Sequence, residues 1–573
     1  MCPLEVRASL AAALLAALLP SVLAAPPAAG AAVPLDAGQG LLDRFRAAFD
    51  GGAGEGGPMD DAGCGTSQVR EYLEQRPGLS PGTVSTIDDF LAYVSDENTL
   101  LSPGGHFRLG WFATGDNAVP SADDDPQDGV PDFVAHIARY LEESWDLAIG
   151  EFGFRAPPGG PIDVSFRRMH YYGYTVPVDP GAGTSRIVLH NSYSRFPPND
   201  DPEGNAIGSA KVTAAHEFRH CSQYAGSRWS EGNWTELDAT WAEERTFPLV
   251  NAYHHYLLGD SPVRRPQLPL DSGPGGTGSY DDAVFAIWLN ARWGDAVIRD
   301  YWERRATMPD EDPLAAWDGV LAPRGASLAA AWAGFTGWNY VVGKRAVVGM
   351  GYADAADYPT GDVFARAESY PARITGTVAH LAATPVELGG FEDLGECLLR
   401  LTFDGHEDDG PLSLALHVRD VDGGASLESV GLDRENDAQV VLRTPAGRLA
   451  SVGIVVGNPA RAGEARAWTI DVDTIPGPPL PPRGRLVSIE PNPCNGGTWF
   501  DCAMTAGAAV EVDVYDARGR RFRRIFGGHL GPGRHRFHWD GRAEDGRPAP
   551  AGTYLAVVTS AGREHARKLT VVR

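Results

Sequence analysis

Apolar and polar positions divide the chain into a mixed helix and strand part and a later part made of short strands. Three runs alternate apolar and polar side chains, which predicts strands: 106–112, 162–166 and 185–190. Four segments are predicted as helices: 132–149, 209–226, 234–244 and 280–293. The last is expected to bury one side, formed by Val284, Ile287, Trp288 and Ala291. Strands and a long helix followed by more helices are typical of an α+β domain, which we place at residues 105–345.

From residue 346 the pattern changes to β structure. Short alternating runs are separated by Gly and Asp turns: 374–378, 397–403, 412–418, 439–442, 452–456 and 467–472. They predict a β-sandwich over 346–475, followed by a stiff Pro-rich linker over 476–484. Residues 485–573 are again all β, with a hairpin signal at 516–519. The predicted fold class is multidomain, with one α+β domain and two Ig-like sandwiches.

The N-terminus reads as a secretory signal over residues 1–24. Arg7 precedes an apolar run, and Val22-Leu-Ala24 fits the small-residue rule for cleavage. The alternative is a membrane anchor, but the run is too short and Pro20 interrupts it. We therefore expect a protein that is secreted or attached to the cell surface, with no transmembrane segment.

Residues 25–104 begin with an Ala/Pro/Gly stretch, and residues 51–57 form a second Gly-rich tract. Helical patterns follow at 67–75 and 84–94. This region is either a propeptide that covers the active site or a simple N-terminal extension, and both interpretations remain open.

Composition limits the partners. Of the 573 residues, 43% are hydrophobic and 22% charged, which is the composition of a folded protein. A chain of this length is too long for a single hydrophobic core. Its formal net charge of −26 argues against nucleic acid or anionic membranes as partners, because like charges repel.

The strongest chemical signal is His216-Glu-Phe-Arg-His220. On a helix the two imidazoles project from one face, one turn apart, and can bind a single metal ion. Glu217 lies beside that face and is placed to take a proton from an activated water. The alternative is two partly buried histidines with a surface glutamate. Ser209 is expected to cap the predicted helix and Gly226 to end it. This helix, the secretory signal and the acid-rich helix that follows favour a metal site.

The third ligand must come from elsewhere. A metzincin needs Gly at 223 and His at 226, whereas this chain has Gln223 and Gly226, which excludes that class. A carboxylate is then required. On the second helix, Glu236 and Glu243 share one face while Asp238 points away. We favour Glu236, with Glu243 as the alternative or as a hydrogen-bond partner for a histidine.

Residues 216–223 and 234–244 resemble the gluzincin-type metallopeptidases of secreted bacterial proteins, which carry H-E-x-x-H-x-x-Q and then W-x-E-G-x-A-x-W. The similarity extends over about residues 105–345. It implies a secreted zinc endopeptidase that acts on protein or peptide substrates. The implied zinc ligands are His216, His220 and Glu236, with Glu217 as the general base.

Two departures from that pattern lie next to the site. Leu237 replaces the usual glycine, and Arg219 and Cys221 stand where the family more often has apolar or small residues. None of the three is an expected ligand, but because they lie next to the site they could alter its electrostatics or its substrate. Cys221 is expected to pack behind the helix, because it points about 100° away from His220.

Peptide hydrolysis also needs a donor for the tetrahedral oxyanion. Tyr280 begins a predicted helix after the third ligand, where related aminopeptidase-type enzymes place a tyrosine, so it is our candidate catalytic donor. The alternative is an ordinary core or surface tyrosine. His254 and His255 are weaker candidates.

An acidic loop at residues 121–132 is a candidate calcium site. Asp124, Asp128 and Asp132 are spaced four apart around a Gly turn, and oxygen-rich loops suit this hard cation. The loop resembles the D-x-D-x-[DN]-G-x-x-D loops of the same family, but Pro126 occupies the second ligand position and Asp125 would have to substitute. The alternative is an acidic loop that caps the next helix.

The segment from residue 489 resembles the Ig-like module of the flagellar hook-cap protein, a pattern that also ends many type IX secretion cargoes. The motifs that carry it are Glu490-Pro-Asn-Pro, Val514-Tyr-Asp-Ala-Arg-Gly519, Trp539-Asp-Gly541 and Gly546 to Tyr554. The resemblance implies a sorting domain that contacts the secretion machinery. The alternative is a plain sandwich. Cys494 and Cys502 flank a turn here and are either a small disulfide or buried free thiols.

Two functions compete. The first is a secreted zinc endopeptidase. The second is a catalytically degenerate surface protein whose β-modules serve adhesion or structure. The complete set of a base and three ligands favours the enzyme.

Overall fold

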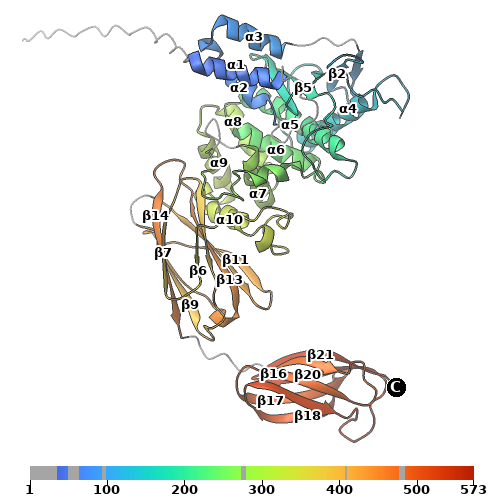
Figure 1. Ribbon diagram of the computed structural model, residues 1–573, viewed down its shortest axis with the longest axis vertical. Coiled ribbons are helices and arrows are strands. Elements are labelled where there is room, and N and C mark those ends of the chain that lie inside the picture. Colours follow the sequence, from blue (N-terminus) through green and yellow to red (C-terminus); the bar gives the residue numbers. More distant parts are fainter. Residues whose placement is uncertain are drawn as a thin grey trace, which may run out of the picture. The chain divides into compact units, whose positions relative to one another are not determined.

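The computed structural model describes residues 35–49, 63–92, 98–124, 126–272, 279–406, 410–476 and 484–572. The expected signal peptide and most of the Pro-rich linker lie outside this part. The chain forms two compact units, one from residues up to 262 with 270–328, the other from 263–269 with 329–573. The predicted multidomain architecture, with helices, several sheets and an all-β C-terminal region, is confirmed (Figure 1).

A five-stranded sheet is the framework of the first unit. Its strands are β1 (Asn98–Leu101), β2 (Phe107–Trp111), β3 (Ile162–Arg167), β4 (Gly173–Asp179) and β5 (Thr184–His190). The spatial order is β1-β2-β3-β5-β4, so β4 is an edge strand, and it runs antiparallel to β5. The three middle strands β2, β3 and β5 are parallel. Three of the strands were predicted from alternation, whereas β1 and β4 were not.

Helices pack on both faces of this sheet, and further helices pack on those. The helices of this unit are α1 (Leu35–Phe49), α2 (Thr66–Gln75), α3 (Pro81–Leu91), α4 (Asp132–Trp145), α5 (Asn205–Ser227), α6 (Trp234–Thr246), α7 (Ala283–Trp293), α8 (Asp295–Thr307) and α9 (Pro313–Leu321). Helices α1–α3 share a core with Tyr174 and Val176 of β4 and Val188 of β5. The intervening Thr175 points the other way, toward α5, because side chains alternate across a strand. Strand β4 therefore links the N-terminal helices to the helix of the H-E-x-x-H motif.

The predicted helices form, and the one expected over 280–293 differs from the prediction in two ways. The segment 280–293 begins as a short turn, Tyr280–Asp282, before α7. Ala291, expected on the buried side of α7, is exposed, whereas Phe285 and Leu289 are buried, because α7 is packed on more than one side.

The second unit begins with α10 (Leu328–Tyr340), whose Ala333 and Tyr340 pack against Ala383, Ala415 and Val455 of the sandwich that follows. This division differs from the predicted domain boundary at residue 345, because α10 lies mainly with the second unit. The apolar side chains of α10 thus extend the core of the β-sandwich.

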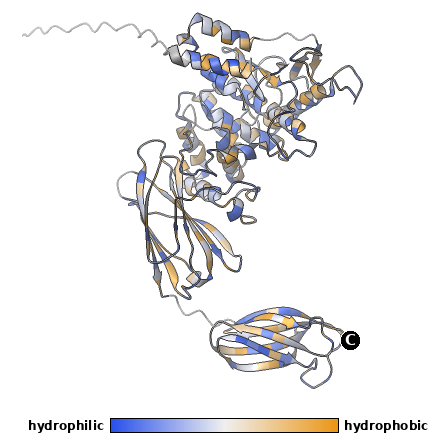
Figure 2. Cartoon of the chain, viewed as in Figure 1, coloured by the Kyte–Doolittle hydropathy of each residue, from blue (hydrophilic) through white to orange (hydrophobic). Residues whose placement is uncertain are grey.

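The sandwich after α10 consists of two sheets in the orders β11-β10-β13-β8-β6 and β12-β9-β14-β7. Its strands are β6 (Ala365–Ala367), β7 (Ala372–Val378), β8 (Ala382–Leu388), β9 (Leu398–Asp404), β10 (Ser413–Asp420), β11 (Ala425–Val430), β12 (Ala438–Val441), β13 (Leu449–Asn458) and β14 (Arg466–Ile475). Exposure alternates along β7 and β9, and hydrophobic and hydrophilic residues are mixed along the strands of this sandwich (Figure 2). The alternation explains why this sandwich was predictable.

The C-terminal sandwich has its own core between the sheets β15-β16-β19 and β18-β17-β20-β21. Its strands are β15 (Gly484–Glu490), β16 (Thr498–Met504), β17 (Ala508–Asp516), β18 (Arg521–Leu530), β19 (Gly533–Trp539), β20 (Gly552–Ser560) and β21 (Arg563–Val571). The hairpin predicted at 516–519 joins β17 to β18, with Gly519 at φ +74°. Cys494 and Cys502 are buried free thiols, so the disulfide alternative is wrong.

No helix in the described part of the chain is long and apolar enough to cross a membrane.

Candidate metal centre

Helix α5 carries the H-E-x-x-H motif against the sheet. It begins at Asn205, after Gly204, and ends where Arg228 adopts a left-handed conformation at φ +58°. Ser209 and Gly226, expected to cap and end this helix, both lie inside it. Ser209 is buried and its hydroxyl accepts a hydrogen bond from Asn199. The H-E-x-x-H motif therefore lies within the helix, more than one turn from either end.

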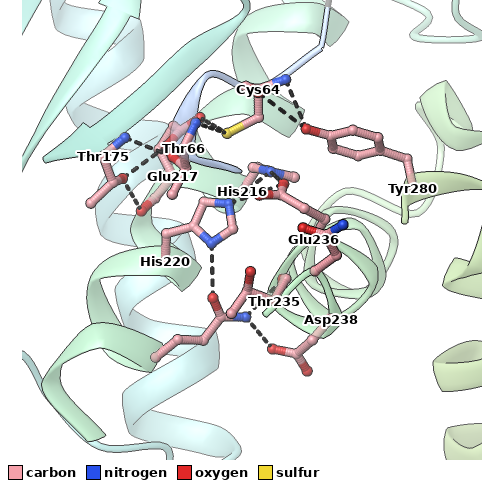
Figure 3. Close-up of polar contacts among 12 residues, drawn as sticks. Cys64, Thr66, Thr175, His216, Glu217, His220, Thr235, Glu236, Asp238 and Tyr280 are labelled. Carbon is pink, nitrogen blue, oxygen red and sulfur yellow. Dashed lines mark hydrogen bonds and ion pairs between the residues drawn. The ribbon is translucent and has the colours of Figure 1, made fainter. Parts of the chain in front are cut away.

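Three predicted ligands converge. The Nε2 atoms of His216 and His220 lie 3.1 Å apart. Glu236 of α6 places Oε2 at 3.2 Å from the first Nε2 and 3.3 Å from the second (Figure 3). All three side chains are buried. The faces of α5 and α6 that carry these three residues therefore meet, as the positions of the residues along each helix predicted.

The other nitrogen of each imidazole is held by a separate partner. His216 Nδ1 lies 2.6 Å from Glu243 Oε1, and His220 Nδ1 lies 2.8 Å from Gln223 Oε1. Such contacts fix the ring orientation and leave both Nε2 atoms facing the centre. Glu243, the alternative third ligand, thus occupies the supporting position instead.

Gln223 is anchored in turn. Its amide donates to Thr235 O at 3.0 Å and to Asp238 Oδ2 at 2.8 Å. Asp238 also accepts from Arg219 Nε at 2.6 Å, and the Arg219 guanidinium lies 3.6 Å from the centre of the Phe154 ring. Arg219 therefore connects α5 to α6, and through Asp238 and Gln223 it supports the orientation of His220.

Glu217 is fully buried beside these candidate ligands. Its Oε2 accepts hydrogen bonds from Thr175 Oγ1 at 2.8 Å and Thr66 Oγ1 at 3.1 Å. Its Oε1 accepts from Cys64 Sγ at 3.0 Å. Gly173 on β4 makes this packing feasible, since a Cβ there would lie 2.8 Å from Glu217 Cγ.

Tyr280 also reaches the centre. Its ring stacks on His216 with 5.9 Å between ring centres, and its hydroxyl lies 3.1 Å from the backbone nitrogen and 3.2 Å from the backbone oxygen of Cys64. Ser279 and Asp282 form a reciprocal capping box around it, which fixes the start of this turn. His254 and His255 are absent from the cavity lining, where Tyr256 stands instead.

The buried carboxylate of Glu236 and the two imidazoles are electrostatically coupled. Burial alone would raise the pKa of Glu236, but charge on His220 and hydrogen bonds from both histidines lower it. Burial alone would lower the pKa of His216, yet contacts with Cys64, Glu236 and Glu243 raise it well above its usual value. A bound cation would supply the same positive charge directly.

The donor set fits zinc. Ligand atoms of Cys64, His216, His220 and Glu236 all lie within 4.8 Å of one another, the one such group found in the described residues. Glu236 Oε1 is buried with no hydrogen-bond partner there, which is costly unless a cation meets it. Nitrogen, sulfur and carboxylate oxygen are the ligands that zinc takes in proteins.

Cys221 is buried and outside this group, as expected, and burial raises the pKa of its thiol to about 12. Leu237 is also buried. Neither residue takes part in the polar contacts described at the centre.

The acidic loop does not assemble a ligand set in the described residues. Asp132 accepts hydrogen bonds from the backbone of Asp124 at 3.2 and 3.3 Å, and Asp128 accepts from the backbone of Val130 at 3.0 Å. Asp125, the proposed substitute ligand, lies outside the described part. The geometry seen is that of carboxylates that close a turn before α4.

Four side chains that lie at the candidate metal centre could not be identified from the sequence: Cys64, Thr66, Thr175 and Tyr256. None lies in the two motif segments, and no local pattern marks them. With His216, Glu217 and Tyr280, Cys64 and Tyr256 line a cavity of about 20 Å³, room for roughly one water molecule.

Comparison with known proteins gave limited matches. Residues 495–564 match the model of the FlgD Ig-like domain, which confirms the predicted Ig-like character of the C-terminal sandwich. The search of curated proteins found no match.

Similar solved structures cover little of the chain. PorZ, an essential bacterial surface component of the type IX secretion system of Porphyromonas gingivalis, is 20% identical over 15% of this chain and 11% of its own, with a TM-score of 0.12. Latent PorU of the same organism is 20% identical over 31% of this chain and 18% of its own, with a TM-score of 0.16. A Ruminococcus gnavus β-glucuronidase is 11% identical over 35% of this chain and 34% of its own, with a TM-score of 0.13. This chain thus spans about a third or less of the lengths of these proteins.

Proposed function

We propose that the chain is a secreted zinc-dependent endopeptidase of the gluzincin type. The observation that carries this proposal is the convergence of His216, His220 and Glu236 beside the buried carboxylate of Glu217. Two imidazoles and one carboxylate leave the fourth position of a tetrahedral zinc for chemistry.

The residues that would hold zinc are His216, His220 and Glu236. When bound, zinc would polarise the attacking water and the carbonyl of the scissile peptide bond. The Nδ1 contacts of Glu243 and Gln223 keep both imidazoles oriented for this task.

Glu217 serves as the general base. Thr175 and Thr66 hold its Oε2, so Oε1 is directed at the centre, where Cys64 Sγ marks the position of an approaching proton donor. There Glu217 takes a proton from the attacking water and then delivers it to the leaving amine.

Tyr280 serves as the oxyanion donor. Its hydroxyl already donates to a backbone carbonyl, that of Cys64, whose Sγ lies with the candidate ligand atoms. A substrate carbonyl in the same place would receive a hydrogen bond that strengthens as negative charge develops.

The test combines metal analysis with peptide hydrolysis. Purified protein should contain one zinc per chain, and His216→Ala or Glu236→Ala should lose it. Hydrolysis of a casein substrate is measured with and without a zinc chelator, for the intact chain and for Cys64→Ala. Zinc absent from all samples would refute the proposal.

We also propose that the C-terminal sandwich directs export through a type IX secretion system, giving a secreted or surface-attached protein. The match of residues 495–564 to the FlgD Ig-like domain supports it, together with the sandwich's separate core. Deleting residues 485–573 should block export and leave hydrolysis intact. Normal export of the shortened chain would count against the sorting role.

A further inference from the structure

Residues 63–66 lie in the candidate metal centre although they precede it in the chain by about 150 positions. Cys64 is buried and offers Sγ to the same group as both histidines and Glu236. Its Sγ lies 3.0 Å from Glu217 Oε1 (Figure 3). The general base and the ligands therefore face the same sulfur.

The segment around Cys64 runs along the free edge of β4. Gly65 N donates to Gly173 O at 2.8 Å, and Tyr172 N donates to Gly63 O at 3.1 Å. Thr175 N donates to Thr66 Oγ1 at 2.8 Å. Backbone pairing with an exposed sheet edge is a common way for a protein to bind an extended peptide. Residues 63–66 thus take a position suited to a substrate strand.

The fit of this segment depends on a small residue. A Cβ at Gly65 would lie 2.8 Å from Tyr171 Cδ2 and 3.1 Å from Tyr174 Cβ. Both tyrosines are held in the packing of β4 and the N-terminal helices. The close approach of Cys64 therefore requires glycine at the next position.

The segment also engages the groups assigned to catalysis. Cys64 and Thr66 donate to the two oxygens of Glu217, and the Cys64 backbone binds the Tyr280 hydroxyl. Only about 20 Å³ of cavity remains at this point, which admits roughly one water and no peptide.

We propose that Cys64 is the fourth protein ligand of the zinc and that residues 63–66 block the substrate position, so that the intact chain is latent. This inference rests on the proposed peptidase function. As sulfur binds the metal, its proton passes to Glu217 Oε1. When the segment leaves, the proton returns to sulfur, and Glu217 regains the ionised form that a base needs.

The ligand assignment is tested without any measurement of activity. Full-length protein is loaded with Co²⁺, and its near-ultraviolet spectrum is recorded for wild type, Cys64→Ala, Cys64→Ser and the control Cys221→Ser. A sulfur-to-cobalt charge-transfer band is expected in wild type and Cys221→Ser and lost in both Cys64 variants, with one metal per chain throughout. A wild type that binds one cobalt without this band overturns the assignment and leaves the proposed function standing.

Latency is tested on the same zinc-loaded samples with a casein substrate. Both Cys64 variants should hydrolyse it roughly tenfold faster or more than wild type, because a tethered ligand competes at an effective concentration on the order of millimolar. A sulfur band in wild type with no gain in either variant would mean a permanently closed structural site, which overturns latency. Failure of every variant to bind metal would instead refute the proposed function itself.

Discussion

Glu243 Oε1 lies 2.6 Å from His216 Nδ1, on the side of the imidazole opposite Glu236. The two glutamates of α6 therefore contact both nitrogens of one histidine: Glu243 orients the imidazole through Nδ1, and Glu236 lies beside Nε2 as a candidate ligand. The seven-residue spacing of the pair on one helix face makes this arrangement possible.

Removing that support should weaken metal binding without abolishing it. Glu243→Ala is expected to lower zinc affinity about 10- to 100-fold, because the imidazole loses the partner that fixes its tautomer and orientation. Competition with a chromophoric chelator measures the change. Glu244→Ala, next along the same helix, is the control and should change the affinity far less. Equal affinity in wild type and Glu243→Ala would show that the contact does not orient a ligand.

Loss of the general base should separate chemistry from metal binding. Glu217→Gln, made in the Cys64→Ala background, is expected to reduce kcat for peptide hydrolysis roughly 10²- to 10⁴-fold while one zinc per chain is retained. The amide keeps an acceptor for Thr175 but cannot take a proton. Undiminished hydrolysis would remove Glu217 from the mechanism.

The hydroxyl of Tyr280 should matter for the transition state alone. In the same background, Tyr280→Phe is expected to lower kcat about 10²- to 10³-fold with little change in KM or zinc content. Tyr301→Phe, a buried tyrosine outside the candidate metal centre, serves as the matched control. A change confined to KM would indicate substrate contact rather than oxyanion stabilisation.

The ion pair of Arg219 and Asp238 should be costly to break on one side. Both side chains are buried, so Asp238→Ala leaves a guanidinium without its charge partner, which costs roughly 3–5 kcal/mol of unfolding free energy. Urea unfolding followed by tryptophan fluorescence measures it. The double variant Arg219→Leu/Asp238→Leu should lose much less, and a double loss as large as the single one would contradict the argument.

Acid should destabilise the first unit through His190. Burial, with nearby Arg195 and Arg168, lowers the pKa of His190 to about 4, and its Nδ1 accepts from two backbone amides at 3.1 Å. The unfolded chain, with a pKa near 6.5, binds the proton first, so stability is complete above about pH 6.5 and falls toward pH 4, by about 3 kcal/mol at most. His190→Gln should flatten this dependence in urea unfolding between pH 4.5 and 7.

His136 on α4, which is not among the groups that lower the pKa of His190, provides the control for that measurement. His136→Gln should keep the slope of wild type. A wild-type slope in His190→Gln would mean that other groups cause the loss of stability in acid.

How far the sequence predicted this site depends on how local each contact is. Helix phase placed His216, Glu217 and His220 correctly, and the same phase argument put Glu236 and Glu243 on one face. Local rules failed at the start of α5, because the helix begins at Asn205, one turn before Ser209, which was expected to cap it. They could not find Cys64, which contacts Glu217 across 153 positions of the chain.

The β structure was also predictable only where the local pattern is clear. Strands with one solvent-exposed face, such as β7 and β9, alternate apolar and polar residues and were predicted. Strands that are buried almost throughout were found only in part: β5 and β13 were predicted, whereas β8 and β4 were missed. Burial on both sides weakens the period of two on which the prediction of a strand depends.

The pairing of Gly63 and Gly65 with β4 has a consequence for the solubility of shortened chains. Without these residues, Gly173 O and the Tyr172 amide would lie at a bare sheet edge, the kind of edge that recruits strands from other molecules. A chain that starts at residue 105 also lacks the three helices that cover the apolar side chains of β4 and β5. Such a chain should aggregate on expression, so the N-terminal helices protect the protein from self-association even if their inhibitory segment is later released.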